Sequence, residues 1–309
     1  MNPTPMNLSP KERARRAFDH RAADRIVKAE LWIGAPVLRR AALADDLAGH
    51  LALRRQLGMD ILFLPLSDQP AVKAEPGYRR FSPADVAAAV DQGEFFVGVV
   101  LDGPLQRLVE ERGLPAVFTD WAAGPDRMVE RLIGASGPVL ELTDTALKLK
   151  VQAVVMAEDL AWQKGPYFKP AEIRPYLRRF YSDFARLVQE GGAKALMHSC
   201  GNIMAFLDDL SAAGLDGLAG AQIECLDAIG IKKEYGRKLT LLTGLPAFLL
   251  DHDDPDEAAW SGFRNTVRRL SEGNGFILGS STGLYAGAHL ERLERLYLIA
   301  EEAISRRDE

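Results

Sequence analysis

The chain has 309 residues, 47% hydrophobic and 26% charged, which is enough apolar sequence to bury a full core and excludes a mainly disordered protein. The net charge of −5 and the presence of only one short basic cluster, residues 11–16, argue against a nucleic-acid partner. Because no apolar run approaches the ~18 residues of a membrane helix, and residues 1–10 lack the apolar core of a signal peptide, we expect a cytoplasmic protein with no membrane partner.

Short apolar runs alternate with helical patterns along the chain. The predicted strands are Ile26–Ile33, Asp60–Leu66, Phe95–Leu101, Val151–Ala157, Ala193–His198, Leu215–Ile223, Leu239–Leu245 and Gly275–Gly279. The predicted helices are Arg39–Leu57, Pro83–Val90, Asp126–Ile133, Ala171–Glu190, Ile203–Ala213, Leu226–Tyr235, Ala258–Glu272 and Ala288–Arg306. The segment Leu105–Gln152 is longer than a minimal crossover and is expected to hold two helices.

This alternation predicts parallel strands joined by right-handed crossovers, either in an open sheet or in a closed barrel. Eight strands in about 300 residues favour a (β/α)8 TIM barrel, an α/β fold with a single domain. An open sheet would more often carry a GxGxxG turn after its first strand, and residues 31–36 lack that spacing. We expect the barrel to span residues 16–309, after an N-terminal extension at residues 1–15.

Polar side chains follow the carboxyl ends of the predicted strands, where barrel enzymes carry their chemistry. Trp162, after the fourth strand, is expected either to line a pocket for a ring-shaped ligand or to pack on the barrel top. The polar candidates are Glu30, Asp102, Glu158, Asp159, His198, Cys200, Gln222, Glu224, Cys225 and Thr282.

His198 and Cys200 form the most suggestive pair among these candidates. On an extended segment, residues i and i+2 point the same way, so both side chains can reach one zinc ion. The alternative is a strand-end histidine bonded to backbone beside an inert buried cysteine. Cys225 follows the next strand and is the expected third metal ligand, with Glu224 as the alternative and Glu158, Asp159 and Glu30 behind it. Cys225 could instead be an ordinary buried residue before a helix.

Several short motifs occur in a defined order along nearly the whole chain. They include Asp24-Arg25-Ile26-Val27, Asp102-Gly103-Pro104, residues 157–165 and His198-Ser199-Cys200-Gly201-Asn202-Ile203. In this order and spacing the chain resembles the uroporphyrinogen decarboxylase superfamily, whose fold is a (β/α)8 barrel. Within it, the chain resembles the branch of zinc-dependent, corrinoid-linked methyltransferases.

The resemblance implies a methyltransferase in which His198 and Cys200 bind zinc together with a third cysteine after the eighth strand. Thr282 stands at that third position here, so either Cys225 or a rim carboxylate replaces the cysteine, or the metal is bound weakly or not at all. It also implies a partner protein that carries cobalamin or another corrinoid, and it is compatible with a homodimer. The metal-free decarboxylases of the superfamily hold acidic substrates with an arginine-rich N-terminal signature, whose arginine pair is missing from residues 25–32.

The leading hypothesis is a metal-dependent methyltransferase that moves a methyl group between a corrinoid protein and a small-molecule donor or acceptor. Glu158 and Asp159 are the expected catalytic carboxylates, which would orient or protonate a leaving group. The expected substrate-binding residues are Glu30, Asp102, Trp162, Gln222 and Thr282. The alternatives are a cofactor-free lyase similar to uroporphyrinogen decarboxylase and a non-catalytic relative that binds a tetrapyrrole or corrinoid.

Overall fold

Eight parallel strands close into a barrel in the computed structural model, which describes residues 7–67, 78–251 and 255–305. Their order around the barrel is β1-β10-β9-β8-β7-β4-β3-β2, so the (β/α)8 fold and all eight predicted strands are confirmed. The strands are β1 Val27–Glu30, β2 Ile61–Pro65, β3 Phe96–Asp102, β4 Ala153–Ala157, β7 Lys194–His198, β8 Gly217–Ala221, β9 Thr240–Leu245 and β10 Phe276–Ser280. A short hairpin of β5 (Ala161–Trp162) and β6 (Gly165–Pro166) follows β4.

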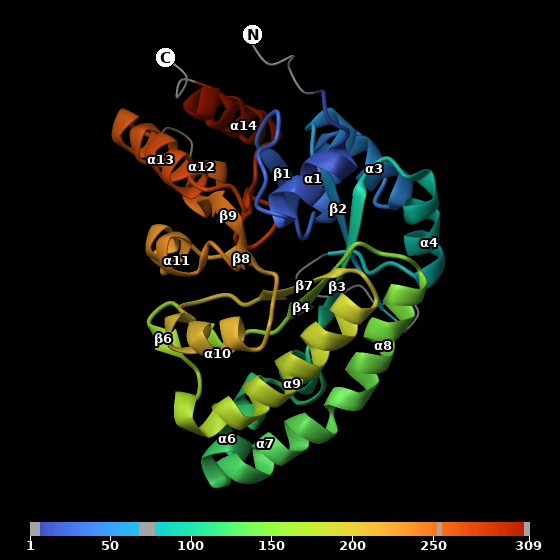
Figure 1. The fold of residues 1–309 in the computed structure, drawn as a ribbon, viewed down its shortest axis with the longest axis vertical. Coiled ribbons are helices and arrows are strands. Elements are labelled where there is room, and N and C mark those ends of the chain that lie inside the picture. Colours follow the sequence, from blue (N-terminus) through green and yellow to red (C-terminus); the bar gives the residue numbers. More distant parts are fainter. Residues whose placement is uncertain (1–6, 68–77, 252–254, 306–309) are drawn as a thin grey trace.

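Helices surround the strands, and α6 and α7 lie farthest from the barrel at one end of the molecule (Figure 1). None of the described helices is long and apolar enough to cross a membrane. The helices are α1 Pro10–Phe18, α2 Ala35–Arg40, α3 Leu47–Gln56, α4 Pro83–Gln92, α5 Pro104–Arg112, α6 Leu114–Ala123, α7 Pro125–Gly134, α8 Ser136–Lys148, α9 Pro170–Glu190, η1 Met204–Phe206 (a 3-10 turn), α10 Leu207–Ala212, α11 Ala228–Tyr235, α12 Ala247–Asp251, α13 Glu257–Leu270 and α14 Leu290–Ser305.

Two segments contain more helices than we predicted. The single helix expected at Arg39–Leu57 is two helices, because Ala42 takes a left-handed conformation with φ of 56° and Asp46 starts α3 by accepting the Gly49 N–H. The segment Leu105–Gln152 holds four helices, α5 to α8, rather than two. Here α6 and α7 each follow a glycine and carry proline in their first turn, where its missing N–H costs nothing.

The barrel has an inner core that is closed at its N-terminal end by α1. Ala14, Ala17 and Phe18 pack against inward-facing residues of the strands, and the Phe18 ring stacks on Phe96 at 5.2 Å between ring centres. A larger apolar layer fills the space between the strands and the outer helices. The domain boundary expected between residues 15 and 16 lies within α1, and the division of the chain there stays a prediction. With the N-terminal end plugged, the opposite end is left for a binding site.

Candidate functional site

The carboxyl ends of the neighbouring strands β4 and β7 bring three potential ligands together. Ala157 pairs with His198 in the sheet, so Asp159 and Cys200 lie side by side two residues further on. The Cys200 N–H donates to Asp159 Oδ1 at 2.8 Å, and Cys200 Sγ lies 3.6 Å from His198 Nε2. One ligand atom from each of Asp159, His198 and Cys200 lies within 4.8 Å of the others. No other such group of three occurs in residues 7–67, 78–251 and 255–305.

The tautomer of His198 is fixed by the adjacent strand β8. His198 Nδ1 lies 2.8 Å from the Ala219 carbonyl oxygen, to which it donates, so Nε2 keeps its lone pair on the side of Cys200. The contact depends on Gly220, where the register between β8 and β9 shifts and φ is +68°. A Cβ atom on Gly220 would lie 2.6 Å from His198 Nδ1, so the imidazole needs a glycine there.

The three side chains fit a zinc ion in both donor type and spacing. Nitrogen, sulfur and carboxylate oxygen are the ligands that zinc takes, and two bonds of about 2.0 to 2.3 Å at a tetrahedral angle separate their ligand atoms by about 3.5 Å. The observed separation of 3.6 Å between Nε2 and Sγ agrees with that value. Burial lowers the pKa of His198 and keeps its imidazole neutral, whereas burial and the Asp159 carboxylate raise the pKa of the Cys200 thiol. A bound dication would offset both effects on the thiol.

Glu158 lies next to this cluster but is held by three donors. Its carboxylate accepts the Tyr176 hydroxyl at 2.7 Å, the Tyr181 hydroxyl at 2.9 Å and the Leu105 N–H at the start of α5 at 2.6 Å. Complete burial raises the pKa of Glu158 to about 7, although these hydrogen bonds oppose the shift. The carboxylate therefore ties the first turn of α5 and two tyrosines of α9 to the end of β4.

The cluster lies at a cavity of about 320 Å³ at the mouth of the barrel. The Trp32 ring stands edge-on to the His198 ring at 4.7 Å between ring centres and also contacts Tyr78. Arg80 contributes a positive charge and binds Asp102 and Glu110, both at 2.7 Å. The charged and polar lining residues are Tyr78, Arg80, Asp102, Gln106, Glu110, Glu158, Asp159, His198, Cys200 and Thr282.

Of the predicted substrate-binding residues, Asp102 and Thr282 line this cavity. Glu30 is completely buried outside the lining, where it accepts the Ser280 N–H at 3.2 Å and the Ser280 and Tyr297 hydroxyls. Trp162 projects into solvent and is half exposed. Gln222 uses its amide oxygen to accept the Gly201 N–H at 2.9 Å, and so it supports the loop that follows Cys200.

The structure does not bring Cys225 or Glu224 into the cluster. Strand β8 ends at Ala221, two residues before the predicted end, and the chain then turns so that the Cys225 N–H donates to the Gln222 carbonyl oxygen. Cys225 Sγ lies 3.5 Å from the same oxygen, and Glu224 accepts the Ala247 N–H at the start of α12. The third ligand atom of the cluster comes from Asp159, which we expected as a catalytic carboxylate and, behind Glu224, as an alternative metal ligand.

Several lining residues escaped the sequence analysis. Tyr78 and Arg80 lie in the long connection between β2 and α4, where no periodic pattern marks a direction. Gln106 and Glu110 are four residues apart on α5 and so share one face of that helix, which is the only signal that could have paired them. Trp32 follows β1 by two residues and resembles an ordinary core residue in the sequence.

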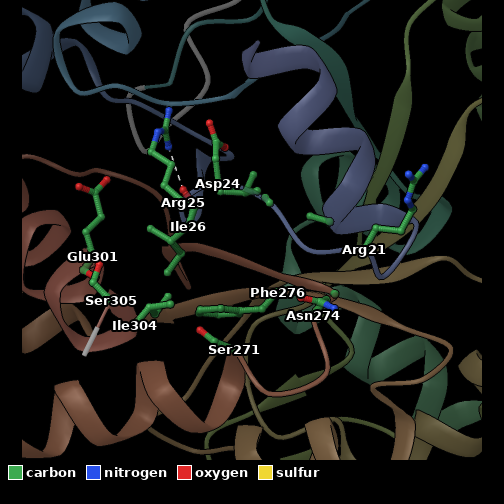
Figure 2. A pocket seen from close by; sticks show the side chains of 14 residues that line it. Arg21, Asp24, Arg25, Ile26, Ser271, Asn274, Phe276, Glu301, Ile304 and Ser305 are labelled. Atoms are coloured by element: carbon green, nitrogen blue, oxygen red, sulfur yellow. Dashed lines mark hydrogen bonds between the residues drawn. The ribbon is translucent and has the colours of Figure 1, made fainter. Parts of the chain in front are cut away.

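A second cavity, of about 460 Å³, lies at the opposite end of the barrel, and Figure 2 shows Arg25, Asp24 and Glu301 around it. Three of the four charged side chains that line it, those of Asp24, Arg25 and Glu301, are in ion pairs, and Arg21 is the fourth. Arg25 binds the Asp60 carboxylate at 2.9 Å, Asp24 binds Arg13, and Glu301 accepts from Lys28 at 2.8 Å. The larger cavity is therefore bounded by structural ion pairs, and the mouth is the better candidate for chemistry.

The sequence matches no protein-family model and no curated protein. Solved structures with 12% to 14% identity share its fold. A methyltransferase from Methanosarcina mazei has 14% identity and a TM-score of 0.73, covering 96% of this chain and 99% of that chain. A B12-independent methionine synthase from Shewanella sp. W3-18-1 has 12% identity and a TM-score of 0.51, with 92% and 96% covered. A sugar phosphate isomerase/epimerase from Parabacteroides distasonis has 12% identity and a TM-score of 0.52, with 90% and 97% covered. At these identities the likeness establishes a barrel fold that methyltransferases share with enzymes of other kinds.

Proposed function

We propose that this chain is a metal-dependent methyltransferase that moves a methyl group between a small molecule and a corrinoid protein. The observation that carries the proposal is the cluster of Asp159, His198 and Cys200 at the barrel mouth, with the His198 tautomer fixed by Ala219. The likeness in fold to a methyltransferase over nearly the full length of both chains adds support. The corrinoid partner is inferred from the motifs described above.

In this proposal His198 Nε2, Cys200 Sγ and an Asp159 oxygen would hold zinc at the wall of the cavity. Zinc bound in such a site supplies Lewis acidity, which keeps a coordinated thiol ionised at neutral pH. Three protein ligands and one open position are typical of catalytic zinc, whereas structural zinc has four protein ligands.

The remaining residues of the mouth position these ligands and shape the cavity. Ala219 orients the imidazole, and Gly201 donates to Gln222 to hold the loop after Cys200. Glu158 has all its principal acceptor positions taken, so we assign it a positioning role for α5 rather than proton transfer. The Trp32 ring packs against the His198 ring and forms part of the cavity wall.

The alternative lyase would require the cavity to bind a polycarboxylate. Four carboxyl groups line the cavity, against Arg80 as the cation among the described lining residues, and Arg80 is already bound to two of those carboxyls. An acidic substrate would therefore be repelled. A relative that binds a corrinoid without turnover stays as an outcome of the test below.

The first test is a zinc measurement on purified protein and matched variants. We expect about one zinc per chain in the wild type, lost in Cys200→Ala and reduced in Asp159→Asn. Cys225→Ala removes the other cysteine of the chain and should leave the zinc content unchanged. Zinc lost equally in both cysteine variants would replace Asp159 by Cys225 as the third ligand. Absence of zinc after loading would end the proposal.

The second test measures methyl transfer from methylcobalamin, as a model of the corrinoid protein, to small thiols. We expect the cobalamin spectrum to change at a rate that depends on zinc and on Cys200. Tight binding of cobalamin without any transfer would instead support the non-catalytic alternative.

A further inference from the structure

The charges that line the mouth cavity are strongly unequal. Among the described lining residues, Arg80 is the cation, and it faces the carboxyl groups of Asp102, Glu110, Glu158 and Asp159. If Asp159 and Cys200 bind zinc, their two negative charges balance the ion. Glu158 is enclosed by its three donors, so the charge of the remaining wall depends on Arg80, Asp102 and Glu110. These three groups together carry one net negative charge.

Arg80 is not free to bind an anionic substrate. Asp102 holds one of its terminal nitrogens at 2.7 Å, and Glu110 holds the other at 2.7 Å. A carboxylate or sulfonate of the substrate would therefore compete with two carboxylates for this one guanidinium. Burial and the Glu110 charge raise the pKa of Asp102, whereas the charges of Arg80 and Arg107 lower it.

Two aromatic rings complete the wall of the same cavity. Trp32 and Tyr78 contact each other at 6.0 Å between ring centres, and both line the cavity. The faces of such rings attract cations, most strongly for tryptophan, and quaternary ammonium groups are often held by aromatic residues beside carboxylates. Rings and surplus carboxylates together favour a positive ligand group.

We propose that the small molecule of this methyltransferase is a thiol that carries a positively charged ammonium group, with its sulfur at Asp159, His198 and Cys200 and its cation toward Asp102, Trp32 and Tyr78. The inference rests on the proposed function. The thiol releases its proton to solvent on binding. Its sulfur lone pair then forms the new S–CH3 bond while the Co–CH3 bond of the corrinoid breaks, and that bonding pair stays on cobalt. The products are a methyl thioether and the corrinoid reduced by two electrons.

The test compares ligands that differ in charge but little in shape. Thiocholine carries a trimethylammonium group, 3,3-dimethylbutane-1-thiol is its neutral isostere, and 3-mercaptopropane-1-sulfonate is an anionic thiol of similar length. The quaternary nitrogen has no lone pair, so thiocholine can reach zinc only through sulfur. With zinc-loaded protein in a calorimeter, we expect thiocholine to bind about 10-fold more tightly than its isostere, and 3-mercaptopropane-1-sulfonate to bind most weakly.

Variants locate the origin of the preference. Asp102→Asn should remove most of the difference between thiocholine and its isostere, and should improve the binding of 3-mercaptopropane-1-sulfonate by releasing one Arg80 nitrogen. Glu111→Gln removes an equal charge from an exposed position of α5 outside the cavity and should preserve the difference.

The two proposals fail in different ways. If zinc binds and the neutral or anionic thiol binds as tightly as thiocholine, the inference is overturned and the proposed function stands. A protein that takes up no zinc overturns both.

Discussion

The two ends of the barrel each present a cavity with buried charged groups. They differ in how fully these groups are already bound by other parts of the chain. At the N-terminal end, the Asp60 carboxylate binds Arg13 at 2.6 Å and Arg25 at 2.9 Å and accepts the Lys28 N–H at 3.0 Å, so both of its oxygens have partners. At the mouth, Cys200 Sγ lies 3.6 Å from His198 Nε2, Asp159 offers a third ligand atom within 4.8 Å of both, and all three residues line the cavity. The candidate site is therefore distinguished by ligand atoms that are not taken up by ion pairs among the described residues, and not by burial or charge.

Cavity size would have led to the opposite conclusion. The N-terminal cavity is larger, at about 460 Å³ against about 320 Å³ at the mouth. Its walls are ion pairs that fasten α1 and α14 to the barrel, as Arg13 and Glu301 show. We therefore predict that substitutions of the cluster residues Asp159, His198 and Cys200 change chemistry with little effect on stability, and that substitutions in the ion pairs at the opposite end do the reverse.

The largest effect is expected from Cys200→Ala. Loss of a direct ligand should weaken zinc binding by more than the roughly 10- to 100-fold typical of residues that only support a ligand, and methyl transfer should fall at least as far. Thermal unfolding of the zinc-free variant should stay close to that of the zinc-free wild type. A large destabilisation in the zinc-free state, absent from Cys225→Ala, would mean that Cys200 is a packing residue.

The converse substitution is Asp60→Asn. It leaves Arg13 and Arg25 beside a neutral amide, and breaking such a buried ion cluster costs about 3 to 5 kcal/mol of unfolding free energy. Denaturant titration measures the loss, and the zinc content should not change. Asp183→Asn, which removes an exposed ion pair with Arg186, should cost less than about 1 kcal/mol. Equal losses in the two variants would contradict the structural role of Asp60.

The barrel itself could be predicted from sequence, because each strand is a short apolar run between helices and the count of eight selects a closed barrel. His198 and Cys200 could be paired because their spacing of two residues fixes their direction on a strand. Both inferences use local periodicity, which a single sequence carries in full.

The third corner of the cluster was not accessible in the same way. Asp159 and Cys225 follow the two neighbours of β7 in the barrel, and choosing between them requires the register of β4 and the exact end of β8. An error of two residues at the end of a strand moves a side chain by more than the width of a metal site. The ion pairs of Arg80 are harder still, since they join three segments that no pattern connects.

Glu30, at the mouth end of β1, should make stability fall as the pH rises. Complete burial raises its pKa to about 7, against its hydrogen bonds with Ser280 and the charge of Arg54. Between about pH 4.5 and 7, Glu30 keeps its proton in the folded state but loses it in the unfolded state. The unfolding free energy therefore falls by up to about 3 kcal/mol as the pH rises through this range. Glu30→Gln should flatten the fall in unfolding free energy, whereas Glu94→Gln on the surface should not. The slope from Glu158 has the same sign and remains in both variants.

Gly220→Ala tests the support of His198. Alanine at this position would have to adopt a left-handed backbone conformation, and its Cβ would displace the imidazole. We therefore expect zinc affinity to fall by about 10- to 100-fold and the unfolding free energy to fall by about 1 to 3 kcal/mol. Gly192→Ala is the matched control, because its φ is +77° and its Cβ would meet nothing within 4 Å. The control should lose stability by about 1 kcal/mol and bind zinc normally. Normal zinc affinity in both variants would show that Ala219 and Gly220 do not orient His198.

The smallest effect belongs to Asp24, which precedes β1 at the opposite end from Glu30. Burial acts to raise its pKa, but the hydrogen bonds from Arg13 and the Leu8 N–H prevail and lower it to about 2. Asp24 therefore contributes about 2 kcal/mol to the unfolding free energy. This contribution is complete above about pH 4 and is lost as the pH falls toward 2. Asp24→Asn should reduce the rise in unfolding free energy between pH 2 and 4, while Asp19→Asn, at an exposed ion pair with Lys194, should keep it. Asp24 and Glu30 lie at opposite ends of β1, and their contributions to the unfolding free energy change with pH in opposite directions. If the unfolding free energy of Asp24→Asn still rises between pH 2 and 4 as in the wild type, Arg13 is held by Asp60 alone.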